Sequence, residues 1–201
     1  MRLIVYFDYT CPYSYAAALW LRQVQARDLG ITTAWRPFIL KEINRQPGEG
    51  MPFWDQQGVT RTRTAQAFIA GQAAARQDPV AYDRFRLTLQ AAFHDRPQDI
   101  RQPGVLEALA AEAGLDVPRF TTDRQDSGLL REAGRSHQEA VTRYAVFGTP
   151  TLVFPDERAV YLKLAPASAS AEAERVFVLL RELITAHPAV QEIKLTRQEH
   201  P

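Results

Sequence analysis

The chain has 201 residues, a single cysteine, and 24 basic against 23 acidic side chains, which gives a formal charge of +1 at pH 7. A chain of this length can bury one substantial core, and a lone cysteine excludes an intramolecular disulfide. The balanced, interspersed charges argue against a nucleic-acid partner, and no apolar stretch is long enough to span a bilayer, so no membrane partner is expected. We expect a cytoplasmic protein, because one cysteine gives no sign of an oxidising compartment and Asp8 interrupts the signal-like apolar start.

The first 40 residues predict a strand, a helix and a second strand. Leu3–Phe7 is a short run rich in branched and aromatic residues, typical of a buried strand. Residues 15–29 carry apolar side chains at helical spacing, and Gly30 marks the end of that helix. Residues 32–40 then have the composition of another strand.

Cys11 lies between the first strand and the first helix, in the sequence Cys11-Pro12-Tyr13-Ser14. The first turn of a helix has unpaired N–H groups and the positive end of the helix dipole, and both favour a thiolate over a thiol. Pro12 fits the first helical position, where its missing N–H costs nothing. The hydroxyl of Ser14 can turn back and donate to the sulfur. We therefore predict that Cys11 is a nucleophile steadied by Ser14, with Tyr13 in contact with the substrate.

The middle of the chain predicts a block of helices. An irregular loop at 44–55 precedes helices at 61–76 and 80–94, a third that starts after Pro103 and ends at Gly114, and two more at 123–133 and 136–146. Phe53, Trp54 and Phe93 are candidates to line a second substrate pocket, although such aromatics more often anchor a core or a loop.

The last quarter returns to strands and ends in a helix. Residues 151–154 and 159–164 flank a polar turn and predict a hairpin. A helix capped by Ser168 or Ser170 follows and ends near His187, and residues 190–196 suggest a further strand. The four histidines (His94, His137, His187 and His200) show no metal-ligand spacing, so we expect no metal site and place each histidine at the surface or at a helix end.

This order of elements resembles the DsbA-like branch of the thioredoxin superfamily. Three segments carry the resemblance: Cys11-Pro12-Tyr13-Ser14 at the position of that branch's Cys-x-x-Cys, Trp35-Arg36-Pro37-Phe38 as its second-strand signature, and Gly148-Thr149-Pro150-Thr151 as its cis-proline loop. The resemblance implies an α/β thioredoxin fold with a helical insertion between its βαβ and ββα halves. The expected division is 1–40 and 136–188 for the thioredoxin domain, 41–135 for the insertion and 189–201 for a C-terminal tail.

The resemblance also implies a thiol–disulfide oxidoreductase, with Thr149 and Pro150 forming a substrate-binding turn opposite Cys11. Ser14 departs from the family pattern, because dithiol relatives carry a resolving cysteine at its position. The protein is therefore expected to act through one cysteine on a thiol or disulfide substrate, either a protein or glutathione. No tightly bound cofactor is expected, glutathione is the candidate co-substrate, and formation of a homodimer stays open.

Two other functional classes remain as alternatives. The glutathione-dependent 2-hydroxychromene-2-carboxylate isomerases and kappa-class glutathione transferases resemble the chain at residues 12–15, but they have serine where Cys11 stands. If glutathione binds, Arg36 and Lys41 are candidates to reach its carboxylates. The third class is a binding module that uses the fold without turnover, because a fold does not determine a function.

Overall fold

The computed structural model describes residues 1–27, 29–45, 50–164, 173–187, 189–191 and 193. The strands are β1 (Arg2–Phe7), β2 (Thr32–Pro37), β3 (Thr151–Val153) and β4 (Ala159–Tyr161). The helices are α1 (Pro12–Gln25), α2 (Leu40–Ile43), α3 (Arg63–Ala75), α4 (Pro79–His94), α5 (Val105–Ala113), α6 (Val117–Asp123), α7 (Leu129–Tyr144) and α8 (Ala173–Ala186).

The strands form a mixed sheet in the order β2-β1-β3-β4. β1 pairs with β2 in parallel, with Leu3 opposite Thr33, and with β3 in antiparallel fashion, with Val5 opposite Leu152. β3 and β4 form the predicted hairpin. Because β1 is central and covered on both faces, it is a continuous apolar run rather than an alternating one, as the sequence indicated.

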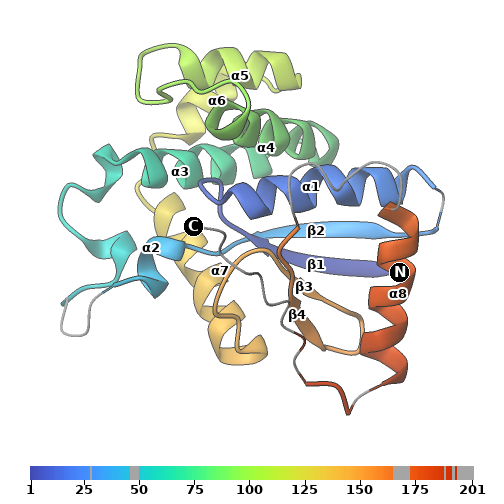
Figure 1. The fold of residues 1–201 in the computed structure, drawn as a ribbon. Coiled ribbons are helices and arrows are strands. Elements are labelled where there is room, and N and C mark those ends of the chain that lie inside the picture. Colours follow the sequence, from blue (N-terminus) through green and yellow to red (C-terminus); the bar gives the residue numbers. More distant parts are fainter. Residues whose placement is uncertain (28, 46–49, 165–172, 188, 192, 194–201) are drawn as a thin grey trace, which may run out of the picture.

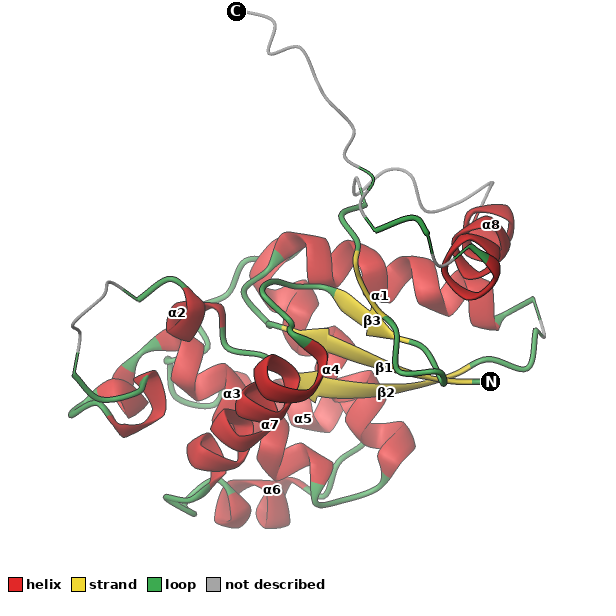
Figure 2. Cartoon of the chain, turned by 90° about the horizontal axis from the view of Figure 1, so that it is seen from below, coloured by secondary structure: helices red, strands yellow, loops and turns green. Residues whose placement is uncertain are grey.

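The two faces of β1 are covered by different helices. Successive side chains of a strand point to opposite faces, so Val5 and Phe7 share a core with residues of α1 and α8, whereas Tyr6 packs with Ala140 of α7. α1 and α8 pack against each other on the first face. Figure 2 shows the sheet between this pair and α7. The arrangement is α/β with a thioredoxin-like sheet, as predicted.

The helical insertion follows β2 and packs beside α1 and the end of the sheet (Figure 1). Within it, α3, α4 and α6 begin at side-chain caps, for example Asp78, whose carboxylate accepts from the backbone N–H groups of Val80 and Ala81 at 3.0 and 2.9 Å. Such a cap satisfies donors that have no partner inside the helix. The predicted boundary after residue 135 falls inside α7, so the division into domains remains a prediction.

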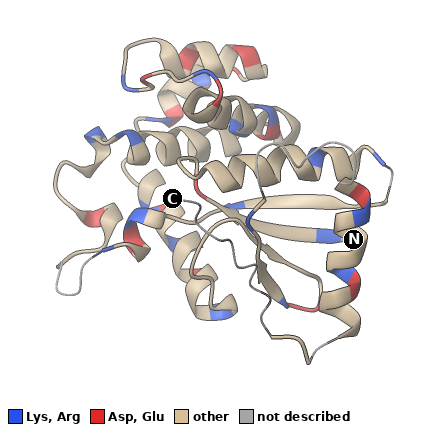
Figure 3. Cartoon of the chain, viewed as in Figure 1, with Lys and Arg blue, Asp and Glu red and all other residues tan. Residues whose placement is uncertain are grey.

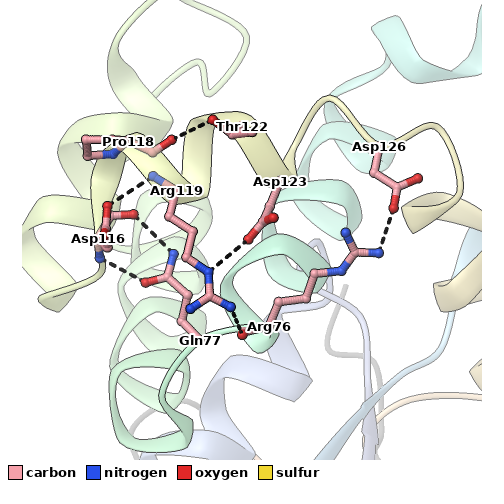
Figure 4. A network of polar contacts seen from close by, with 8 residues as sticks. All are labelled: Arg76, Gln77, Asp116, Pro118, Arg119, Thr122, Asp123 and Asp126. Atoms are coloured by element: carbon pink, nitrogen blue, oxygen red, sulfur yellow. Dashed lines mark hydrogen bonds and ion pairs between the residues drawn. The ribbon is translucent and has the colours of Figure 1, made fainter.

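A polar network joins the C-terminal end of α3 to α6 (Figure 4). Arg119 donates to the carbonyl of Arg76 at 2.6 Å, and the side chain of Gln77 exchanges two hydrogen bonds with the backbone of Asp116 at 2.9 and 3.1 Å. Arg76 also forms an ion pair with Asp126 at 2.7 Å. These groups are partly or fully exposed, so each pair contributes little stability, and their main effect is to orient α6.

Basic and acidic residues are scattered along the ribbon in the view of Figure 3. This distribution agrees with the near-zero net charge. Within the part of the chain that the structure describes, none of the helices combines the length and the apolar character that a transmembrane span requires.

Three predictions about elements were wrong or only partly testable. The two helices predicted at 123–133 and 136–146 are one continuous helix, α7, which passes through Gly134, and α6 was not predicted. A Cβ at Gly134 would lie 2.5 Å from the ring of Trp54, so this glycine makes room for a neighbour rather than ending a helix. Of the strand predicted at 190–196, residues 190, 191 and 193 are not in a strand and the others lie outside the described residues, as do the caps proposed at Ser168 and Ser170.

Candidate active site

Cys11 occupies the N-cap position of α1, with Pro12 as the first helical residue. Its backbone is extended (φ −88°, ψ 116°), and its carbonyl accepts the first helical hydrogen bond from Tyr15 N at 3.2 Å. Cys11 therefore stands at the start of the helix, next to backbone N–H groups that have no partner inside it, although its side chain makes no capping hydrogen bond. The side chain is 5% exposed, so it is nearly covered but not sealed.

The loop before β3 meets this sulfur. The Cys11 thiol donates to the backbone carbonyl of Thr149 across 3.4 Å, although the two residues are 138 positions apart in the chain. The Thr149–Pro150 peptide bond is cis, and the carbonyl of Pro150 accepts from Leu162 N at 3.1 Å. The structure thus brings together Cys11, Thr149 and Pro150, which the sequence analysis had singled out from opposite ends of the chain.

Ser14 lies one turn after Cys11 and is fully buried. Its hydroxyl oxygen accepts a long hydrogen bond of 3.4 Å from the backbone N–H of Asp8. Among the hydrogen bonds of the described residues there is none from Ser14 to the sulfur. The hydroxyl still has its proton to donate, so its predicted effect on a thiolate remains a prediction, while its observed contact holds the segment before Cys11.

Asp8 is a component that the sequence analysis noted only as an interruption of the apolar start. Its carboxylate is completely buried and accepts from Thr10 N and Thr10 Oγ1, both at 2.8 Å, and from Leu40 N at 2.9 Å. Burial raises the pKa of Asp8, and these hydrogen bonds and the charge of Lys41 oppose that rise. Asp8 therefore connects the Cys11 loop to the start of α2. The feature of the sequence that could have identified Asp8 is a lone acidic residue at the end of a buried strand.

Lys163 is a second residue that the sequence analysis did not single out. Its Nζ lies 5.0 Å from the centre of the Tyr13 ring and 5.7 Å from that of Tyr161. Tyr13 is 39% exposed, so its ring is accessible from solvent. Because Lys163 lies in a chain segment 150 residues away from Tyr13, nothing local in the sequence indicated this contact.

The end of α4 closes over the other side of the Cys11 segment. His94 Nε2 lies 3.1 Å from the carbonyl of Tyr9, and the His94 ring stacks on Tyr15 with ring centres 5.6 Å apart. The hydroxyl of Tyr15 donates to Asp95, and burial together with this hydrogen bond raises the pKa of Tyr15 to about 12. The helical insertion therefore contributes to the surroundings of the cysteine.

The other predicted binding residues lie elsewhere. Phe53 is buried, Trp54 packs on Gly134, and Phe93 lies under the guanidinium of Arg63 at 3.9 Å, which matches the alternative of core anchors. Arg36 lines a groove of about 900 Å³ along the outer edge of β2, and neither Cys11 nor Thr149 lines that groove.

Three of the four histidines lie within the described residues. Among the described residues, no three side chains of His, Cys, Asp or Glu gather closely enough to hold a metal ion. His94 and His187 lie at helix ends, as predicted, and His200 lies outside the described residues. His137 contradicts the prediction of a surface or helix-end position, because it is 3% exposed inside α7.

A thioredoxin-like sheet with a cysteine at the N-cap of the first helix, opposite a cis-proline loop, defines a thioredoxin-fold protein of the DsbA type. Residues 2–180 match the family described as DSBA-like thioredoxin domain, and the chain belongs to that family.

Among proteins with curated descriptions, the chain is 28% identical over 150 residues, 73% of its length, to an uncharacterized protein of Mycobacterium tuberculosis, Rv2286c. The chain spans 61% of the length of that relative.

Solved structures share the fold at low sequence identity. A putative protein disulfide isomerase from Nitrosomonas europaea has a TM-score of 0.64 at 19% identity, over 92% of this chain and 98% of the other. A 2-hydroxychromene-2-carboxylate isomerase gives 0.63 at 16%, over 96% of this chain and 100% of the other. The cytosolic disulfide reductase DsbM from Pseudomonas aeruginosa, solved with GSH, gives 0.62 at 17%, over 90% of this chain and 98% of the other. These relatives are disulfide oxidoreductases or isomerases, and their likeness to the chain is one of fold.

Proposed function

We propose that the protein is a thiol–disulfide oxidoreductase that acts through Cys11 alone. The observation that carries this proposal is the position of the only cysteine, at the N-terminus of α1 and 3.4 Å from the carbonyl of Thr149 in the cis-proline loop. That position sets a nucleophilic side chain beside a backbone group able to hold a substrate next to it.

In the proposed reaction the thiolate of Cys11 attacks one sulfur of a disulfide R–S–S–R′. A bond forms between Sγ and that sulfur while the original S–S bond breaks, and R′–S⁻ leaves and takes a proton from water. Ser14 occupies the position of a resolving cysteine, so the mixed disulfide persists until an external thiol attacks it. That second exchange releases a new disulfide and restores the thiolate of Cys11.

Thr149 has a direct part in this scheme. In the resting thiol its carbonyl accepts the S–H proton, and once the thiol ionises that carbonyl has lost its donor. An N–H group of an extended substrate can then bond to it, which aligns the substrate with the sulfur in the manner of an added strand. Pro12 and Pro150 shape the two segments that meet here, Tyr13 borders the site, and no cofactor is required.

Glutathione is the proposed external thiol and co-substrate. The DsbM structure with GSH supports this choice by similarity of fold, and the reducing cytoplasm, our proposed location, maintains glutathione as a thiol. A glutathionylated protein or peptide is then a natural substrate, because its mixed disulfide requires one nucleophilic cysteine and one molecule of glutathione for full reduction.

The first test is intact-mass analysis after incubation with oxidised glutathione. We expect one added glutathionyl group on the native protein, none on Cys11→Ser, and removal of the group by reduced glutathione. A second assay follows the release of peptide from a glutathionylated peptide at a fixed glutathione concentration. Turnover should exceed the reaction with glutathione alone and disappear in Cys11→Ser. Two outcomes contradict the proposal. In one, the native cysteine never forms the adduct; in the other, reduced glutathione removes the glutathionyl group only after the protein has been unfolded.

The same variant separates the alternatives. Relatives of the isomerase and transferase type carry serine at this position, so Cys11→Ser that retains a glutathione-dependent isomerase or transferase activity favours that class. A binding module gives no turnover with either protein and an unreactive Cys11.

A further inference from the structure

The segment after β4 lies directly beside the cis-proline loop. Leu162 N donates to the carbonyl of Pro150 at 3.1 Å, and the next residue is Lys163. A Cβ at Gly148 would lie 3.0 Å from Cε2 of Tyr161, so the ring of Tyr161 packs closely on the start of the same loop. Both Lys163 and Tyr161 are therefore fixed relative to the backbone that meets Cys11.

The ammonium group of Lys163 is held by two tyrosines that approach it from different parts of the chain. Tyr13 comes from the first turn of α1 and Tyr161 from β4, with ring centres 5.0 and 5.7 Å from Nζ. An aromatic ring attracts a cation without neutralising its charge. The described residues provide no carboxylate within ion-pair distance of Lys163, whose side chain is exposed. The ammonium is thus positioned but still able to bind an anion.

Lys163 also lies close enough to the reacting sulfur for Cys11 to contribute to the pKa of Lys163. A hydrogen bond and charge interaction with Tyr161 raise the pKa of Lys163 most, and the charges of Tyr13 and Cys11 contribute in the same direction. Lys163 therefore stays protonated at neutral pH, and its ammonium lies within electrostatic reach of the site where a thiolate forms.

Exposed aromatic surface completes this side of the site. Phe147 is 65% exposed, and its ring centre lies 5.0 Å from that of Tyr161. The rings of Phe147, Tyr161 and the half-exposed Tyr13 can make apolar contact with a short carbon chain. The ammonium group of Lys163, which has no ion-pair partner among the described residues, lies next to them. A small thiol or disulfide that carries a carboxylate a few bonds from its sulfur has the matching chemistry.

We propose that Lys163 is a specificity-determining residue that binds a carboxylate of the thiol or disulfide substrate while the substrate's sulfur reacts with Cys11. This inference rests on the proposed function and narrows its substrate class to anionic thiols and their disulfides. The exchange itself is unchanged: Cys11 thiolate displaces one half of the disulfide as a thiolate, and the half that stays attached keeps its carboxylate at Lys163.

Three disulfides of the same skeleton test the proposal. At pH 7, 3,3′-dithiodipropionate is anionic, bis(2-hydroxyethyl) disulfide is neutral and cystamine is cationic. The measurement is the second-order rate constant of reduced native protein with each compound, by quenching and intact mass. If replacing Lys163 changed only the fraction of Cys11 present as thiolate, all three rate constants would change by the same factor. The ratio of the rate constant for the anionic disulfide to that for the cationic disulfide therefore reports recognition of the substrate's charge.

Relative to the reaction of free 2-mercaptoethanol with the same compounds, which corrects for their different leaving groups, we expect the wild type to prefer the anion. We expect Lys163→Gln to lower the ratio by roughly fivefold, the size of one partly solvated charge interaction over several ångströms. Lys163→Arg should keep most of the preference, and added salt should reduce it in the wild type. Arg181→Gln removes the same charge from an exposed position on α8 and should leave the ratio unchanged.

An unchanged ratio in Lys163→Gln, with all three compounds still reacting, overturns the inference and leaves the proposed function standing. Failure of every disulfide to react with the native wild type overturns the proposed function, and this inference with it. Because Lys163 is exposed, its variants should fold, and a thermal melt of each variant verifies this.

Discussion

The imidazole of His137 makes the stability of this fold sensitive to mild acid. It is 3% exposed inside α7, with its ring centre 4.3 Å from that of Phe38 and 5.6 Å from that of Trp54. Its Nδ1 accepts from Ile39 N at 3.2 Å, which leaves the proton of the neutral ring on Nε2. Burial lowers the pKa of His137 from 6.5 to about 4.

The sign and size of the effect follow from proton linkage. As the pH falls below 6.5 the unfolded chain binds a proton at this residue before the folded protein does, so the folded state loses stability until the pH reaches the folded pKa. With values of 6.5 and about 4, the loss between pH 7 and pH 5 is about 2 kcal/mol, and it approaches about 3 kcal/mol at pH 4.

The assay is chemical denaturation of the wild type and His137→Asn at pH 7 and pH 5. Asn can accept from Ile39 N through its side-chain oxygen but does not titrate, so the variant lacks this contribution. Asp8, whose raised pKa acts in the opposite direction, and His94, whose lowered pKa acts in the same direction, are present in both proteins and cancel in the comparison. His187→Asn, at an exposed position after α8, is the matched control.

We expect the wild type to lose about 2 kcal/mol more than His137→Asn between the two pH values, and His187→Asn to behave as the wild type does. Equal losses in the wild type and His137→Asn would refute the reasoning. They would mean that the folded protein protonates this ring as readily as the unfolded chain does.

Two further substitutions test the packing around the cysteine, each by chemical denaturation. Gly71→Ala would bring a Cβ to 2.1 Å from the hydroxyl of Tyr9, so we expect a loss of about 1–3 kcal/mol despite the better helix propensity of alanine, whereas Gly50→Ala, with open space around it, should change stability by less than about 0.5 kcal/mol. Asp8→Asn would turn an amide N–H toward buried N–H donors and should cost about 1–3 kcal/mol; equal stability to the wild type would show that those donors have other partners.

Much of the fold could be predicted because its signals are local. The apolar run that became β1 and the junction at Cys11 with Pro12 were visible within a few residues. The helices α3 and α4 were predicted to within two residues at either end. The error at α7 arose where a local signal misleads: Gly134 normally weakens a helix, but here its missing side chain accommodates Trp54 from a distant turn.

The candidate site could be predicted only in part. Cys11 was singled out from its position in the sequence, and Thr149 and Pro150 from their resemblance to a known loop. Asp8 and Lys163 were not singled out as site residues, because the role of a charged side chain depends on the residues that surround it. An aspartate after a strand is usually solvated, and only the packing around Leu40 makes this one a buried acceptor.

The sequence by itself determined the elements and the chemistry available to them: one thiol at a helix N-terminus, a serine one turn later, and a later proline turn. These follow from propensities, capping and hydrophobic periodicity, which act over a few residues. Only the tertiary structure decided that the sulfur meets the carbonyl of Thr149 and that Lys163 lies over Tyr13. Those contacts depend on the pairing of β1 with β3, which brings distant segments together through the shared core.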